Sequence, residues 1–323
     1  MPGLVAAVLS PRGRTVRAAG LADVAAKRPM TAEHGFRLGG ASMLFLSVIA
    51  HRLASEKQLA LDGPLSKLLP PGALSGLDGA ASASLKRVLQ QAAGIDDYLF
   101  SAPFYAELRG TPAKRFQPGD LLAAAVREAR SPERAAPPQP GAFLAAATNA
   151  VIAAMAIEAA TRQPLDQVLQ EKLARPAGMR MTRLPSPGAA AAATPEMARP
   201  YWDFLGDGKL RDASTAAASG ALGPGGIVST AADLLAFADA LFRRETLLPR
   251  RTVEDMATGG TLEYGVGMEV AETPWGLALG HSGTAFGYSA ELYFLAEVDT
   301  VVVVLANGEA TGEMAWSLME TWR

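Results

Sequence analysis

Cysteine is absent from this chain of 323 residues, which excludes disulfide bonds, thiolate metal sites and a thiol nucleophile. Histidine is scarce, because only His34, His51 and His281 occur, and none of them has the HExxH spacing of a zinc site. A site made of carboxylate ligands is the open alternative. We expect no metal ion and no cofactor.

An excess of one charge is also lacking. The net charge is −2 and 19% of the residues are charged, which excludes a disordered acidic or basic tail and gives no electrostatic footprint for nucleic acid. No apolar run reaches the roughly 18 residues of a membrane span. Residues 1–10 are apolar but lack the basic segment of an export signal. We expect a soluble, cytoplasmic protein.

Strand patterns stand at both ends of the chain, and helical patterns lie between them. The expected strands are 4–9, 15–19, 264–270, 276–281, 288–295 and 300–306. The expected helices are 44–57, 85–91, 120–128, 149–161, 164–173, 231–242 and 314–322. Residues 185–195 are expected to form a loop, with a helical turn at 189–193 as the alternative.

The two groups of strands must share one sheet, because neither group is stable alone. We therefore predict an α/β (α+β) fold with an antiparallel sheet of about five strands flanked by helices. Residues 1–40 and 216–323 form the sheet domain of this prediction. Residues 41–215 form an inserted, mainly helical domain, and a cleft separates the two.

Four short segments carry a family resemblance. They are FRLG at 36–39, LALDGPLSKLLP at 59–70, GGIVSTAADL at 225–234 and GHSGT at 280–284. In this order they resemble the serine β-lactamase and penicillin-binding-protein superfamily, and within it the branch of class C β-lactamases, family VIII esterases and DD-peptidases. The resemblance covers nearly the whole chain and implies the β-lactamase/transpeptidase-like fold.

The resemblance also implies acyl-transfer groups that this sequence does not have. The family's S-x-x-K motif supplies a serine nucleophile and a lysine one turn later, and Y-x-N supplies a tyrosine. Those positions read Gly40, Met43 and Ala147 here, while Asn149 is kept and residues 281–283 retain H-S-G. No serine stands three residues before any lysine. The resemblance therefore predicts degenerate catalytic motifs.

Two interpretations of these replacements stay open, namely drift after loss of function and remodelling into an apolar, enlarged pocket for an uncharged ligand. The first functional hypothesis is a pseudoenzyme that binds a small molecule or a protein partner. The second is an enzyme with a non-covalent step, such as a cyclisation, an isomerisation or an elimination. An active serine hydrolase or esterase ranks last.

His281 and Asn149 are the candidate catalytic residues. His281 has an ordinary pKa near neutrality, and the resemblance directs it into the cleft; a satisfied strand histidine is the alternative. Asn149 starts a predicted helix and has helix capping as its alternative. The candidate ligand-binding residues are Gly40, Met43, Ala147, Ser282, Phe286, Tyr288, Asp97 and Tyr98.

Each ligand-binding candidate has a structural alternative. Asp97 and Tyr98 follow Asp96 on a predicted loop, where a solvated loop is the alternative to a pair of acid–base carboxylates. Core packing is the alternative for the aromatic candidates. Neighbouring side chains on a strand point to opposite faces, so Ser282 and His281 cannot form a direct dyad. The expected ligand is small, mostly apolar and uncharged.

Overall fold

A computed structural model describes the chain except for residues 112–113, 133, 135–137, 186–195, 311–312 and 322–323. The loop predicted at 185–195 lies, apart from residue 185, outside the described residues, and so does the alternative helical turn at 189–193. Among the described residues, no helix combines the length and the apolar character that crossing a membrane requires.

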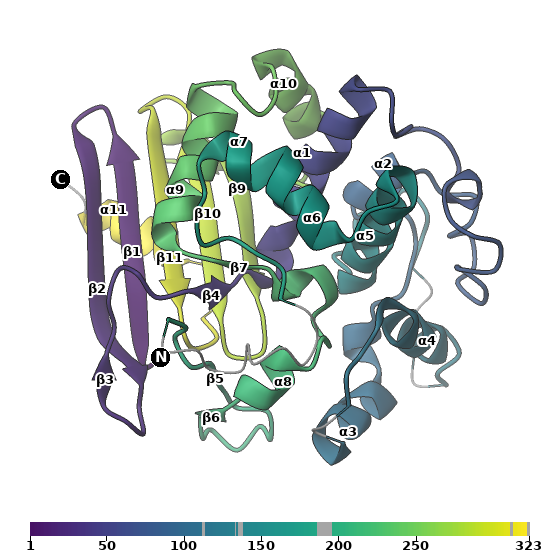
Figure 1. Cartoon of the computed structure of the whole chain (residues 1–323), viewed down its shortest axis with the longest axis horizontal. Helices are drawn as coiled ribbons and strands as arrows, with labels where there is room; N and C mark the ends of the chain where they lie inside the picture. Colours follow the sequence, from purple (N-terminus) through teal and green to yellow (C-terminus); the bar gives the residue numbers. More distant parts are fainter. Residues whose placement is uncertain (112–113, 133, 135–137, 186–195, 311–312, 322–323) are drawn as a thin grey trace.

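A seven-stranded antiparallel sheet organises the molecule (Figure 1). Its strands, in spatial order, are β3 (Arg28–Pro29), β2 (Gly13–Asp23), β1 (Gly3–Ser10), β11 (Thr300–Ala306), β10 (Ser289–Leu295), β9 (Gly276–Thr284) and β8 (Glu269–Thr273). The first strand pairs with the last, with Leu4 opposite Ala306. The predicted antiparallel sheet shared by both ends of the chain is confirmed. It has seven strands instead of about five because β2 runs on to pair with the short β3, and β8 forms a hairpin with β9.

The helices begin and end within a few residues of most predictions. They are α1 (Ser42–Ser55), α2 (Leu85–Leu89), α3 (Ala102–Gly110), α4 (Pro118–Ala129), α5 (Ala147–Thr161), α6 (Leu165–Leu169), α7 (Arg175–Ala177), α8 (Ser214–Ala218), α9 (Ala231–Ala238), α10 (Arg250–Thr258) and α11 (Met314–Thr321). The sequence analysis missed α3, α7, α8 and α10. The chain also forms the short helical turns η1 (Gly39–Ala41), η3 (Tyr98–Phe100) and η5 (Gly223–Gly226). It forms two further short strands, β4 (Phe36–Arg37) and β7 (Val228–Ser229).

Both faces of the sheet are covered by helices. Helix α9 packs on β1, β10 and β11, whereas α11 packs on the other face of β10 and β11. Helix α1 contacts β9 and also α5, so it joins the sheet to the helical region on the right of Figure 1. Residues 43–50 of α1 are all buried, as expected for a helix surrounded on every side. The domain division at residues 40 and 215 stays a prediction.

Two glycines hold the start of α1 against β9. Gly39 has a φ of +54°, and a Cβ placed on it would lie 2.0 Å from the Thr284 carbonyl oxygen. A Cβ on Gly283 would lie 2.4 Å from the backbone nitrogen of Ala41. Only glycine allows such close backbone approach at these positions. The φ angle of Gly40, the residue after Gly39, lies outside the left-handed region, so the backbone at this position does not require glycine.

The strand predicted at 264–270 is wrong in its position, because β8 begins at Glu269. The backbone before it turns back on β8, since Val270 N donates to Glu263 O, and it also bonds to helices: Val266 N donates to Met256 O, and Gly267 N donates to Leu89 O. Gly267 also has a φ of +70°, which interrupts an extended chain. The loop before β8 therefore places Tyr264 next to β9.

Candidate functional site

His281 lies near the end of β9 and is 6% exposed. Its Nε2 is 2.9 Å from the Tyr264 hydroxyl, and its Nδ1 is 2.6 Å from the carbonyl oxygen of Ser282. A carbonyl oxygen only accepts, so Nδ1 carries a hydrogen, and in the neutral ring Nε2 accepts from Tyr264. The imidazole is therefore oriented through both of its nitrogens.

Glu269 contacts both His281 and Ser282, which are neighbours on β9 and were expected to point to opposite faces of the sheet. Its Oε1 lies 3.3 Å from His281 Nδ1 and accepts a hydrogen bond of 2.9 Å from Ser282 Oγ, while its Oε2 accepts from the Tyr293 hydroxyl. Burial would raise the pKa of Glu269, but His281 and the two hydroxyl donors outweigh burial and lower that pKa. An ionised carboxylate therefore lies beside the imidazole.

Gln91 connects Asn149 to Tyr264. Gln91 Oε1 accepts from Asn149 Nδ2 at 2.5 Å and from Ala146 N at 3.1 Å, and the Gln91 side chain also hydrogen-bonds to Tyr264. Asn149 does not cap α5, and its buried Oδ1 has no partner among the described residues. A series of hydrogen bonds therefore links Asn149, through Gln91 and Tyr264, to His281, whose Nδ1 lies 3.3 Å from Glu269 Oε1.

The sequence analysis missed Tyr264 and Glu269 as members of this site. Tyr264 was assigned to a strand, and no local motif marked Glu269 as a partner of the H-S-G segment. The available signal was the pair of glycines in Tyr264–Gly267, because glycines in an apparent strand indicate close backbone approach.

Gly40, Met43 and Ala147 lie close to this series in different environments. Gly40 is exposed, and a Cβ placed on it would lie 4.0 Å from His281 Cε1. Met43 is 1% exposed and belongs to the core. Ala147 is half-buried at the start of α5, and its backbone nitrogen donates to Asp97 Oδ2 at 3.0 Å. Among these three residues, Gly40 is the one that opens to solvent beside His281.

Asp97 and Tyr98 are buried and hold the adjoining backbone. Asp97 accepts hydrogen bonds from the nitrogens of Leu99 and Ala147, and burial raises the pKa of its carboxyl although these donors act in the opposite direction. The Tyr98 hydroxyl donates to Ala221 O at 2.9 Å. The alternative of a solvated loop is wrong for both residues, because their polar atoms are bonded to backbone in the interior. Their predicted contact with a ligand stays a prediction.

Phe286 and Tyr288 follow β9 and are 4% and 2% exposed. Phe286 stacks on Trp202 with ring centroids 5.1 Å apart, and Tyr288 meets the edge of Phe36 and donates its hydroxyl hydrogen to Ala198 O at 2.6 Å. These contacts place both rings in the core. Their role as part of a ligand wall stays a prediction.

We expect Asp97→Ala to lower the free energy of unfolding by about 2 kcal/mol, because buried backbone N–H groups of η3 and α5 lose their acceptor. Urea unfolding followed by circular dichroism measures this loss. Asp97→Asn keeps an acceptor oxygen and should lose clearly less. A loss below about 0.5 kcal/mol for Asp97→Ala would contradict the capping role.

We expect Glu269→Gln to weaken the dependence of stability on acid pH. The pKa of Glu269 lies below its ordinary value of 4.5 in the folded protein, so its contribution is complete above the unfolded pKa and is lost as the pH falls through the folded pKa. Unfolding curves at about pH 7 and pH 3 should therefore differ less in the variant. Glu272→Gln changes an exposed carboxylate on the same strand and should preserve the wild-type difference.

A family model described as Beta-lactamase matches residues 1–316 of the chain. Among curated proteins, the chain is 30% identical over 190 residues to Esterase EstB of Burkholderia gladioli. The matched part is 58% of this chain and 46% of the relative, so the chain spans about half the length of that relative.

Solved structures share the fold over nearly the whole chain. A D-stereospecific amidohydrolase from Streptomyces sp. has a TM-score of 0.80 at 24% identity, covering 95% of this chain and 89% of its own. A D-amino acid amidase from Ochrobactrum anthropi SV3 has a TM-score of 0.79 at 23% identity, with coverages of 97% and 88%. A penicillin binding protein from Bacillus halodurans has a TM-score of 0.80 at 18% identity, with coverages of 99% and 96%. At these identities the likeness concerns the fold.

Proposed function

The chain belongs to the Beta-lactamase family, and from that premise we propose that it binds a small, mostly apolar and uncharged molecule non-covalently in the cleft beside His281. The observation that carries this proposal is Gly40. It is exposed next to His281, where acyl transfer in this family would need a hydroxyl, and its backbone does not require glycine.

No described serine near His281 takes over the nucleophile's role. Ser42 is fully buried, and its Oγ has no hydrogen-bond partner among the described residues. Ser282 donates to the Glu269 carboxylate and not to His281. A serine needs a base that accepts its proton during attack, and Met43 offers a buried thioether in place of an amine. These contacts support a cleft without covalent catalysis.

The proposed character of the ligand follows from the side chains near Tyr264 and His281. Phe143 and Leu144 are 45% and 40% exposed, and Phe143 packs on Tyr264 with ring centroids 4.9 Å apart. The polar side chains beneath them already bond to one another, and residue 43 carries no charge. Such a surface favours apolar contacts with a few hydrogen bonds.

A second candidate function is a proton-transfer reaction such as an isomerisation or an elimination. The observation that favours it is the placement of His281 between the ionised Glu269 carboxylate and the Tyr264 hydroxyl. A carboxylate beside an imidazole can orient that imidazole as a general base. If the ligand is turned over, His281→Ala should reduce the rate more than any serine-to-alanine change.

Calorimetric titration with phenylacetamide and phenylacetate tests the binding site. We expect the neutral amide to bind more tightly than the anion, and Gly40→Trp to abolish amide binding by filling the opening. Gly110→Trp is the matched control, since Gly110 is exposed, lies outside the left-handed region and has no atom within 4 Å of an added Cβ. Equal binding by Gly40→Trp and the wild-type protein would refute the cleft as the site.

Native mass spectrometry of the purified protein provides a second measurement. A small molecule that is retained by the wild-type protein and lost in Gly40→Trp supports the proposal. Failure of both the titration and the retention experiment, together with a protein partner whose binding Gly40→Trp abolishes, would favour the alternative of a partner-binding pseudoenzyme.

A further inference from the structure

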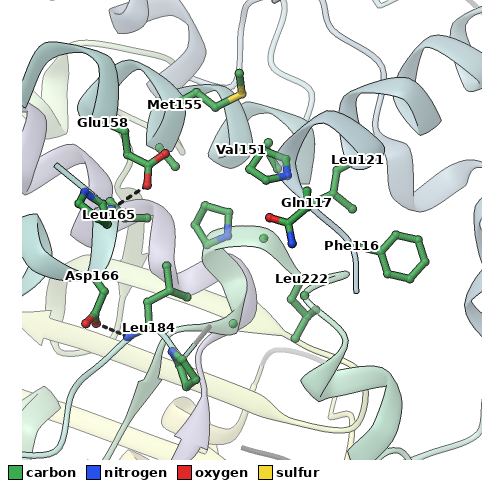
Figure 2. A pocket seen from close by; sticks show the side chains of 18 of the residues that line it. Phe116, Gln117, Leu121, Val151, Met155, Glu158, Leu165, Asp166, Leu184 and Leu222 are labelled. Atoms are coloured by element: carbon green, nitrogen blue, oxygen red, sulfur yellow. Dashed lines mark hydrogen bonds between the residues drawn. The ribbon is translucent and has the colours of Figure 1, made fainter. Parts of the chain in front are cut away.

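A cavity of about 380 Å³ lies between α4, α5 and η5 (Figure 2). Val151 and Met155 of α5, Leu121 of α4 and Leu222 give it a largely apolar lining. Among the described residues that line it, neither Gly40 nor His281 is present. The volume falls within the range of small-molecule sites.

Arg37 on β4 also lines this cavity and is 4% exposed. Its Nη1 donates to Gly226 O at 2.8 Å, and the described residues give it no ion pair with a carboxylate. Burial lowers the pKa of Arg37, and the ionisable groups that act on it next are Tyr288 and Arg183. A buried guanidinium without a counter-charge is costly.

Two carboxylates in the lining already have backbone partners. Glu158 Oε1 accepts from Leu165 N at 2.7 Å, and Asp166 Oδ1 accepts from Leu184 N at 2.7 Å (Figure 2). These bonds hold the start of α6 and the segment at Leu184, and neither carboxylate bonds to Arg37. An anionic group would therefore bind at Arg37 and away from these carboxylates.

We propose that this cavity is a second ligand site, which binds an apolar organic anion with its carboxylate against Arg37 and its hydrocarbon part along Val151, Met155 and Leu222. A guanidinium offers a carboxylate several donors in one plane. The exposed residues Gln117 and Pro164 stand at the rim, so the cavity is accessible from solvent while its charged group is buried.

Calorimetric titration with octanoate, octan-1-ol and octylammonium tests this site. We expect octanoate to bind the wild-type protein about tenfold or more tightly than either of the other two. Arg37→Met should remove that preference, and Arg37→Lys should keep part of it. Ala154→Phe, which fills the apolar part of the cavity from α5, should abolish octanoate binding, and in combination with Gly40→Trp it should abolish binding of all three.

The comparison remains decisive if Arg37→Met fails to fold, because the wild-type preference and the effect of Ala154→Phe need no change at Arg37. Gly40→Trp should leave octanoate binding unchanged, which separates this site from the cleft. In the Gly40→Trp variant, whose site beside His281 is filled, equal affinity for octanoate and octan-1-ol or a preference for octylammonium would overturn the proposal. No detectable octanoate binding by the wild-type protein, or full octanoate binding by a folded Ala154→Phe, would overturn it as well.

Discussion

Incubation with benzylpenicillin or a fluorophosphonate should leave the intact mass of the protein unchanged. A stable adduct requires an activated hydroxyl, and the position beside His281 carries Gly40. In serine hydrolases, removal of the nucleophile or its base leaves only residual catalysis, several orders of magnitude below the working enzyme. We therefore expect no acyl-enzyme on the time scale of hours.

An active serine hydrolase treated in parallel shows that the reagents are competent. An adduct on this protein would contradict the prediction, and peptide mapping would then identify the nucleophile. Ser282 is the residue to inspect first, because its Oγ is hydrogen-bonded to Glu269 close to His281. Ser282→Ala would abolish such an adduct if the carboxylate served as the base.

The fold was predictable because its signals are local or shared by the two ends of the chain. The valine-rich segment at 300–306 is fully buried between two strands and was predicted with its observed bounds. Helix α10 was missed because its 9 residues include several charged side chains, and its apolar positions, Val253, Met256 and Ala257, are few. Tertiary contacts decide whether such a short segment forms a helix.

The candidate site was predictable only in part. The resemblance located His281 and Asn149, which the structure joins through Gln91 and Tyr264. It could not show that Glu269 reaches His281, because that contact depends on where β8 begins and on the register of Glu269 opposite Gly280. Sequence spacing does not determine a hydrogen bond between residues brought together by a loop.

We expect the combined variant Gly40→Ser, Met43→Lys and Ala147→Tyr to gain slow acylation by 4-nitrophenyl butyrate. A side chain at residue 40 requires a small local shift, because an added Cβ would lie 3.3 Å from Ser282 O, which is a tight contact. Ala147 is half-buried, so a tyrosine ring can extend toward the opening. The demanding change is at Met43, where a lysine must remain buried until it pairs with the new hydroxyl.

Each single restoration should stay within about twofold of the wild-type rate, because nucleophile and bases act as a unit. The triple variant should exceed the wild-type rate by about tenfold or more and show an acyl adduct by intact mass. The matched control replaces Gly40→Ser by Gly40→Ala in the same background, which preserves the other two changes and removes the hydroxyl. A folded triple variant that stays inert toward several acyl probes would show that residues 40, 43 and 147 no longer meet in the geometry that acyl transfer requires, and the cleft would then have been reshaped beyond the loss of its reactive groups.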